Sequence, residues 1–195
     1  NDMNLRPDPT YHASPKLAME APVENYAFTV MLSPDGSQSD GIAVIDLKQG
    51  SPSYGEIVHQ VIVPNTGDEF HHFGWNACSS SLSPLSGHAF LERRYVIDVK
   101  DPLQAHIHKT IEPEELFAKT GYSRPHTIHC GPEGIYVSCL GGGGEDGTDG
   151  PPGIFIMDCE TFEIIGQYEM DRGKQDKHYD FWWNLPQDYM VSSEW

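Results

Sequence analysis

His71-His72-Phe73-Gly74-Trp75-Asn76 is followed along the chain by two stretches that begin alike, Pro125-His126-Thr127-Ile128-His129-Cys130 and Tyr179-Asp180-Phe181-Trp182-Trp183-Asn184. His72 and His126 are 54 residues apart, and His126 and Asp180 are again 54 residues apart. A period near fifty residues is typical of a repeated structural unit. Whatever position the unit gives to its first residues, this chain places a histidine there twice.

A short apolar segment that ends in Asp recurs with nearly the same step. Each segment is followed by a turn and a second candidate strand, and the pairs cover 43–47 with 55–63, 95–99 with 105–111, and 155–159 with 162–170. Their alternating pattern and their β-branched and aromatic residues favour strands joined by hairpins. We interpret the terminal Asp as a turn residue whose carboxylate accepts hydrogen bonds from nearby backbone N–H groups. The glycine-rich run 141–153 is predicted to be a flexible hairpin loop.

The helical signal is weak, with one turn expected over residues 15–20 and two turns over 113–119. Four short strands in each unit of about fifty residues predict an all-β fold made of β-propeller blades. Residues 1–195 are then the N-terminal part of a single β-propeller domain. It has a leader segment over 1–24 and blade openings near residues 71, 126 and 179. We expect the remaining blades to come from the rest of the protein or from another chain, since open sheet edges are avoided.

Composition excludes several classes of function. A net charge of −17 argues against a nucleic-acid partner, which requires a basic surface. No stretch approaches eighteen consecutive apolar residues, so we expect no membrane span. The N-terminal segment lacks the basic and apolar regions of a signal peptide, which leaves a periplasmic and a cytoplasmic location both open. Four scattered cysteines predict free, buried thiols rather than a disulfide framework.

The repeat brings chemistry-bearing residues to one place. In a propeller the innermost strand of each blade lines the central channel, so His72, His126 and Asp180 are expected to converge at one mouth. Several converging imidazoles are a metal-site geometry. We therefore predict metal ligands among His71, His72, His126 and His129, although each one alone is equally explained as a polar channel residue bonded to water or backbone. Trp75 and Trp183 are expected to pack between blades.

Cys78 follows the first histidine pair and has two readings. A thiol near imidazoles is either a soft ligand and reactive thiolate or an inert buried side chain. The other histidines carry less weight. His59 and His108 occupy matching places in outer strands and are expected to be solvated, whereas His178 can reach the channel.

Longer stretches resemble one known family. Residues 68–80, Asp-Glu-Phe-His-His-Phe-Gly-Trp-Asn-Ala-Cys-Ser-Ser, resemble the Asp-Glu-Leu-His-His-Ser-Gly-Trp-Asn-Thr-Cys-Ser-Ser segment of the selenium-binding protein family, whose enzymatic members are methanethiol oxidases. Residues 126–130, 179–182 and 192–195 are similar to its His-Thr-Ser-His-Cys, Tyr-Asp-Phe-Trp and Ser-Thr-Glu-Trp motifs. These collinear matches extend over nearly the whole chain.

The resemblance implies a larger propeller, for which we expect a ring of seven blades with about three in this chain. It also implies a copper-dependent enzyme that converts methanethiol, O₂ and water into formaldehyde, hydrogen sulfide and hydrogen peroxide. The family cysteine that is linked to selenium falls on Cys78. Where the family often has a second Cys three residues later, this chain has Ser81, which removes a possible dithiol partner.

Two functions therefore remain open. The first is a copper oxidoreductase in which copper is held by some of the four histidines and by ligands outside this chain. Asp180 acts as a base or orients a ligand histidine, Cys78 binds sulfur or selenium species, and the partners are a small thiol and O₂. The alternative is a non-enzymatic selenium- or sulfur-binding scaffold that acts through Cys78. A calcium-dependent propeller lactonase is disfavoured because calcium prefers oxygen ligands to histidine.

Overall fold

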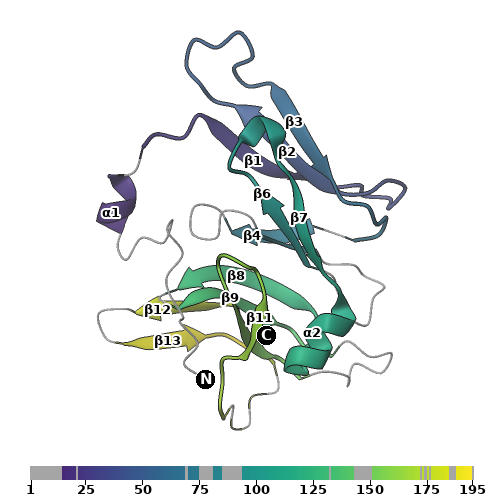
Figure 1. Cartoon of the computed structure of the whole chain (residues 1–195), viewed down its shortest axis with the longest axis vertical. Helices are drawn as coiled ribbons and strands as arrows, with labels where there is room; N and C mark the ends of the chain where they lie inside the picture. Colours follow the sequence, from purple (N-terminus) through teal and green to yellow (C-terminus); the bar gives the residue numbers. More distant parts are fainter. Residues whose placement is uncertain are drawn as a thin grey trace.

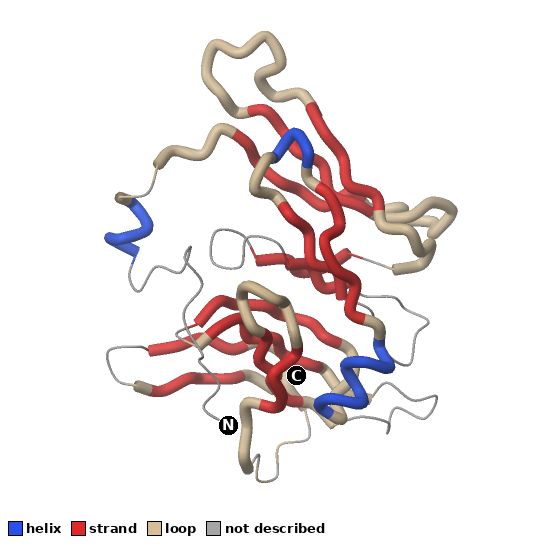
Figure 2. The backbone as a smooth tube through the Cα atoms, viewed as in Figure 1, coloured by secondary structure: helices blue, strands red, loops and turns tan. Residues whose placement is uncertain are grey.

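The computed structural model describes residues 15–20, 22–68, 70–74, 81–84, 94–131, 133–142, 151–171, 173, 175, 177–184 and 188–194. Within these residues strands predominate, and helix is confined to three short segments (Figure 2). The segments are α1 (Pro15–Met19), the 3₁₀ helix η1 (Pro102–Gln104) and α2 (Pro113–Thr120). Both predicted helices are thus confirmed.

Four antiparallel sheets follow one another in chain order (Figure 1). The first has the order β1-β2-β3, with β1 (Tyr26–Met31), β2 (Gly41–Asp46) and β3 (Ile57–Ile62). The second has the order β4-β5-β6-β7, with β4 (Phe70–Gly74), β5 (Ser81–Pro84), β6 (Arg94–Asp98) and β7 (His106–Ile111). The third contains β8 (Pro125–Gly131), β9 (Gly134–Cys139), β10 (Gly153–Met157) and β11 (Ile164–Gln167). The fourth pairs β12 (Phe181–Asn184) with β13 (Tyr189–Ser192).

This arrangement confirms the all-β prediction and agrees with propeller blades. Strands β4, β8 and β12 each form one edge of their sheet, and β8 contacts both β4 and β12. The first strands of successive units therefore lie next to one another, as the innermost strands of blades do. The seven-bladed ring and the boundaries of the domain stay predictions.

Period-two alternation lets the inner sheets serve two cores each. In β6, Tyr95 and Ile97 pack in a cluster with residues of the first sheet, whereas Val96 packs in a cluster with the third sheet. In β10, Phe155 belongs to the cluster shared with the second sheet, and Ile156 to the cluster shared with the fourth. Burial on both faces explains why these strands read as continuous apolar runs rather than as alternating ones.

The aspartates that end the repeated apolar strands are turn residues, as predicted. Asp46 Oδ1 accepts a hydrogen bond from the Lys48 amide, and Asp98 Oδ1 accepts one from the Lys100 amide, both at 2.8 Å. Asp158 Oδ1 accepts from the amide two residues later at 2.9 Å. Shortly before each aspartate the pairing with the outer strand shifts register, which marks a β-bulge repeated in all three units.

Two further observations bear on the sequence predictions. Cys139 and Cys159 are buried thiols outside any disulfide, which confirms the expectation for these two residues. Among the described residues, no helix has the length and apolar character needed to cross a membrane.

Candidate functional site

The two strands that carry the predicted ligand histidines, β4 and β8, share a local irregularity. In β8 the register shifts between Pro125 and Ile128, so that His126 and Thr127 together face Ser138 of β9. In β4 the register shifts between residues 70 and 72, because residue 70 pairs with residue 84 of β5 and residue 72 pairs with residue 83. A bulge adds one residue to a strand and re-aims the side chains around it. Both histidine pairs of the sequence thus begin at a bulge on the edge strand of a sheet.

His126 is buried and held at one ring nitrogen. Its side chain is only 1% exposed, and its Nδ1 lies 2.9 Å from Thr127 Oγ1 and 3.4 Å from the carbonyl oxygen of Tyr179. Ser138 Oγ donates to the same carbonyl at 2.8 Å and accepts from the Thr127 amide at 3.0 Å. A carbonyl only accepts hydrogen bonds, so this contact favours the tautomer that carries its proton on Nδ1 and its lone pair on Nε2.

His129 lies at the junction of β8 and β12 and pairs with Asp180. Its Nε2 is 3.2 Å from Asp180 Oδ1, which also accepts the Phe181 amide at 2.7 Å. Burial lowers the pKa of His129, and the hydrogen bond and charge of Asp180 oppose that effect only in part. His129 is therefore neutral near pH 7, donates from Nε2 to the carboxylate and carries its lone pair on Nδ1.

Aromatic rings surround this pair. The imidazole of His129 meets the rings of Phe181 at 5.1 Å, Trp182 at 4.7 Å and Trp183 at 6.2 Å, all nearly edge to face. Trp183 also contacts Tyr136 of β9 at 4.9 Å, which confirms its predicted role in packing between sheets. The rings limit the access of water to His129, which is the physical cause of its lowered pKa.

The structure brings some of the predicted site residues together and leaves others undescribed. Asp180 hydrogen bonds to His129 and not to His126, its counterpart in the 54-residue repeat. The side chains of His71 and His72, and the whole of Cys78, lie outside the described residues. Within the part of the chain that is described, no group of three His, Cys, Asp or Glu side chains gathers in a way that can hold a metal ion.

The peripheral histidines differ from one another. His59 is half-buried, and its Nε2 lies 2.8 Å from the carbonyl oxygen of Ala105, so the expectation that it is solvated was wrong. The ring reaches across to the second sheet, which the sequence pattern does not reveal. His108 is exposed, as expected. His178 is buried, with Nδ1 3.1 Å from Gln175 Nε2 and its ring stacked on Phe181.

Sequence reasoning missed the groups that hold the histidines in place, namely Ser138, Thr127 and the carbonyl of Tyr179. One signal was present, because serines at 83, 138 and 192 repeat with nearly the step of the histidines. Each serine lies opposite the first residues of an edge strand, either as a regular pairing partner or across from the bulge. The carbonyl of Tyr179 gave no signal, since a backbone group has none in the sequence.

The donor set fits copper in kind. His126 and His129 are imidazoles in which an oxygen acceptor contacts one ring nitrogen, the arrangement that orients metal-bound histidines in proteins. Neutral imidazole is also a ligand that copper accepts. Two imidazoles are fewer than a complete ligand set, so further ligands must come from residues other than these.

Comparison with known proteins places these features in a family. A family model described as 56kDa selenium binding protein (SBP56) matches residues 5–195. A methanethiol oxidase of Xenopus laevis is 37% identical over 196 residues, which cover 94% of this chain and 41% of the relative. Selenium-binding protein 3 of Arabidopsis thaliana is 35% identical and is covered to 40%.

A solved structure gives the same picture. The X-ray structure of a hypothetical selenium-binding protein from Sulfolobus tokodaii matches with a TM-score of 0.80 and 45% identity, over 96% of this chain and 44% of that chain. The chain therefore spans about two fifths of the length of the relatives that it matches.

Proposed function

The chain belongs to the 56 kDa selenium-binding protein family, and on that premise we propose that it is the N-terminal part of a copper-dependent methanethiol oxidase. The reaction consumes one methanethiol, one O₂ and one water, and releases formaldehyde, hydrogen sulfide and hydrogen peroxide. Several relatives are named methanethiol oxidase, which supports the proposal. Since they are more than twice as long, the activity is proposed for the complete protein.

The contact between His129 and Asp180 carries the proposal. It joins β8 to the start of β12, and it fixes a neutral imidazole at the edge of two adjacent sheets. The buried His126 lies three residues earlier in the same strand, with its Nδ1 within reach of the Tyr179 carbonyl. These are oriented nitrogen donors rather than solvated surface histidines, and oriented donors are what a resident metal requires.

In the proposed site His126 and His129 hold the metal, and His71 and His72 are the candidates for the remaining nitrogen ligands. Copper, when bound, supplies a soft centre for methanethiolate and a redox link to O₂. Asp180 keeps His129 oriented through Nε2. Its carboxylate side chain is 49% exposed, and in this proposal it accepts the proton that methanethiol or water gives up. The rings around His129 shield its imidazole in part from water.

Metal analysis and product assays on the full-length protein test the proposal. His126→Ala should remove most of the bound copper and abolish the release of sulfide and peroxide. Asp180→Asn should keep the metal better and reduce turnover by about 10- to 100-fold or more, since it leaves the ligand histidines in place but weakens the orientation of His129 and removes the proton acceptor. His106→Ala is the matched control, because His106 is exposed and bonds only to the nearby Gln104 carbonyl. Unchanged sulfide release in His126→Ala would refute the proposed site.

The alternative is a selenium- or sulfur-carrying scaffold that acts through Cys78. The name of the Arabidopsis relative is the observation that favours it. Selenite labelling that is lost in Cys78→Ser, in a protein that holds no copper and makes no peroxide from methanethiol, would replace the oxidase proposal with this one.

A further inference from the structure

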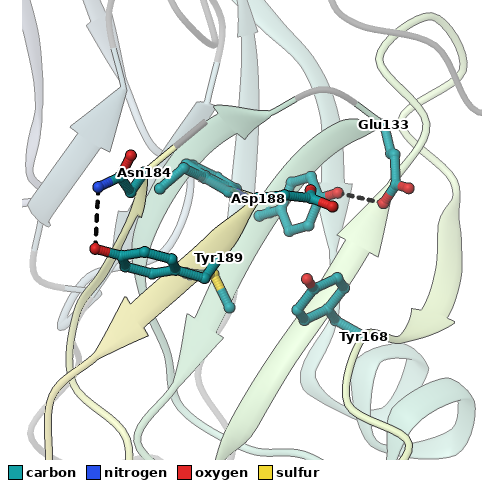
Figure 3. A pocket seen from close by; sticks show the side chains of 8 residues that line it. Glu133, Tyr168, Asn184, Asp188 and Tyr189 are labelled. Atoms are coloured by element: carbon teal, nitrogen blue, oxygen red, sulfur yellow. Dashed lines mark hydrogen bonds between the residues drawn. The ribbon is translucent and has the colours of Figure 1, made fainter. Parts of the chain in front are cut away.

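A small pocket lies beside the β12–β13 hairpin, against the third sheet (Figure 3). Its volume is about 110 Å³, which is enough for a small organic group. The lining residues come from β9, from the two hairpin strands, from the residues just before β9 and β13, and from the residue after β11, and are Glu133, Tyr136, Tyr168, Trp183, Asn184, Asp188, Tyr189 and Met190. Trp183 separates the pocket from His129, so the pocket is distinct from the proposed copper site.

Four of the eight residues that line the pocket are aromatic. Tyr136 stands edge to face against Trp183 at 4.9 Å and against Tyr168 at 5.3 Å, and Tyr189 completes the lining from β13. Figure 3 shows the rings of Tyr168 and Tyr189 on opposite sides of the pocket. Ring faces carry negative potential and attract cations, so aromatic walls of this kind favour a positively charged guest.

Two carboxylates add negative charge at the same place. Glu133 Oε2 accepts a hydrogen bond from the Tyr136 hydroxyl at 2.5 Å, which holds the carboxylate at the pocket wall. Asp188 lines the pocket from the start of the hairpin strand, with a left-handed φ of 54° that Asp tolerates better than most residues. Among the described residues, no lysine or arginine forms an ion pair with either carboxylate.

The titration of Tyr168 agrees with this charge. Burial raises the pKa of its hydroxyl, and the negative charges of Glu133, Glu169 and Asp188 raise it further. The same negative charges would attract a cation in the pocket.

We propose that this pocket binds the methylated ammonium group of a small molecule. The ring faces and the two carboxylates supply attraction without requiring N–H donors on the guest. The polar groups in the pocket also bond in part to one another, since the Tyr189 hydroxyl accepts from Asn184 Nδ2 at 3.0 Å. A quaternary ammonium, which has no N–H group, suits such a site better than a primary amine.

Calorimetric titration of the full-length protein with choline, compared with its neutral isostere 3,3-dimethylbutan-1-ol, tests the proposal. The two probes have nearly the same shape and differ in charge. Choline should bind at least about tenfold more tightly than the isostere. The salt concentration is matched with potassium chloride, because screening weakens attraction by exposed carboxylates.

Variants identify the site. Glu133→Gln combined with Asp188→Asn removes both charges, and Asn tolerates the left-handed backbone at residue 188. This variant, and separately Tyr168→Leu, should each weaken choline binding about tenfold. The matched controls Glu114→Gln and Tyr54→Leu alter exposed residues outside the pocket and should change nothing.

Equal affinity for the two probes, no choline binding at millimolar concentration, or full binding by the charge-neutral variant would each overturn the proposal. Because the readout is binding and not oxidation, failure here leaves the copper proposal untouched, and loss of activity in the site histidine variants leaves this one untouched.

Discussion

Replacing Ser138 with alanine tests whether one buried hydroxyl ties β8 to β12. Ser138 is fully buried, and its Oγ accepts from the Thr127 amide at 3.0 Å, donates to the Tyr179 carbonyl at 2.8 Å and also lies 3.4 Å from the Thr127 carbonyl. In Ser138→Ala the amide loses the bond that fills its bulge position, while the carbonyl keeps its 3.4 Å contact with His126 Nδ1. A buried polar group left without a partner costs about 1–3 kcal/mol. We expect a loss of about 2–3 kcal/mol, because one group is orphaned and the second is weakened.

Urea unfolding followed by tryptophan fluorescence and by circular dichroism measures this loss. Ser37→Ala is the matched control, since Ser37 is exposed and its hydroxyl bonds only to the neighbouring Asp35. That control should change the free energy of unfolding by less than about 0.5 kcal/mol. If Ser138→Ala is no more destabilising than Ser37→Ala at an unchanged m-value, the hydroxyl does not link the two strands and the account of the bulge is wrong.

Three other predictions concern packing, pH and a surface ion pair. Gly153→Ala should lower the stability by about 1–3 kcal/mol or more, measured as a fall in the melting temperature, because the new Cβ overlaps the buried ring of Tyr122. In the metal-free protein His129 should make stability fall as the pH drops below 6.5, its ordinary pKa, since burial lowers the pKa in the folded state and the unfolded chain then binds more protons. His129→Gln should flatten that slope, and an equal slope in this variant would contradict the assignment. Glu163→Gln should cost at most about 1 kcal/mol, and less at high salt, because the Glu163 side chain that pairs with two lysines is itself 57% exposed.

Much of the fold can be predicted from the sequence, because the repeated units use the same local signals for strands and turns. Each apolar strand that ends in aspartate forms the same turn, so that Asp46, Asp98 and Asp158 all bond to an amide two residues later. The short helix of residues 113–120 begins at a proline and ends at Gly121, whose φ of 71° is the left-handed conformation that glycine favours. Such signals depend only on neighbours in sequence, and they placed the repeated strand pairs and the two α-helices, whereas β1, β5, β9 and η1 were not predicted individually.

The site is less readable, because its contacts join residues far apart in the chain. The repeat suggested that Asp180 and His126 share a place, yet Asp180 pairs with His129. A spacing gives the strand to which a residue belongs, but it does not give the direction of the side chain once a bulge has inserted a residue. The lowered pKa of His129 was equally hidden, since it arises from three aromatic rings on the next edge strand.

The strand register shows which sheets the 54-residue step relates residue by residue. Between β8 and β12 the step holds, because His129 faces Tyr136 just as Trp183 faces Met190, 54 residues further along both strands. Between β4 and β8 it does not, because the Phe70–Pro84 pair corresponds to Pro125–Cys139, a step of 55.

A slip of one residue reverses the face of every side chain in a strand. In this register His71, and not His72, corresponds to His126. Each of these two histidines directly follows the last regular pair before the bulge, which is Phe70–Pro84 in one sheet and Pro125–Cys139 in the other. The histidine pair in β4 makes this slip tolerable, since either register leaves an imidazole at the position where the edge strand of the next sheet places His126. For the proposed copper site, a doubled histidine therefore keeps an imidazole available as a candidate ligand in either register.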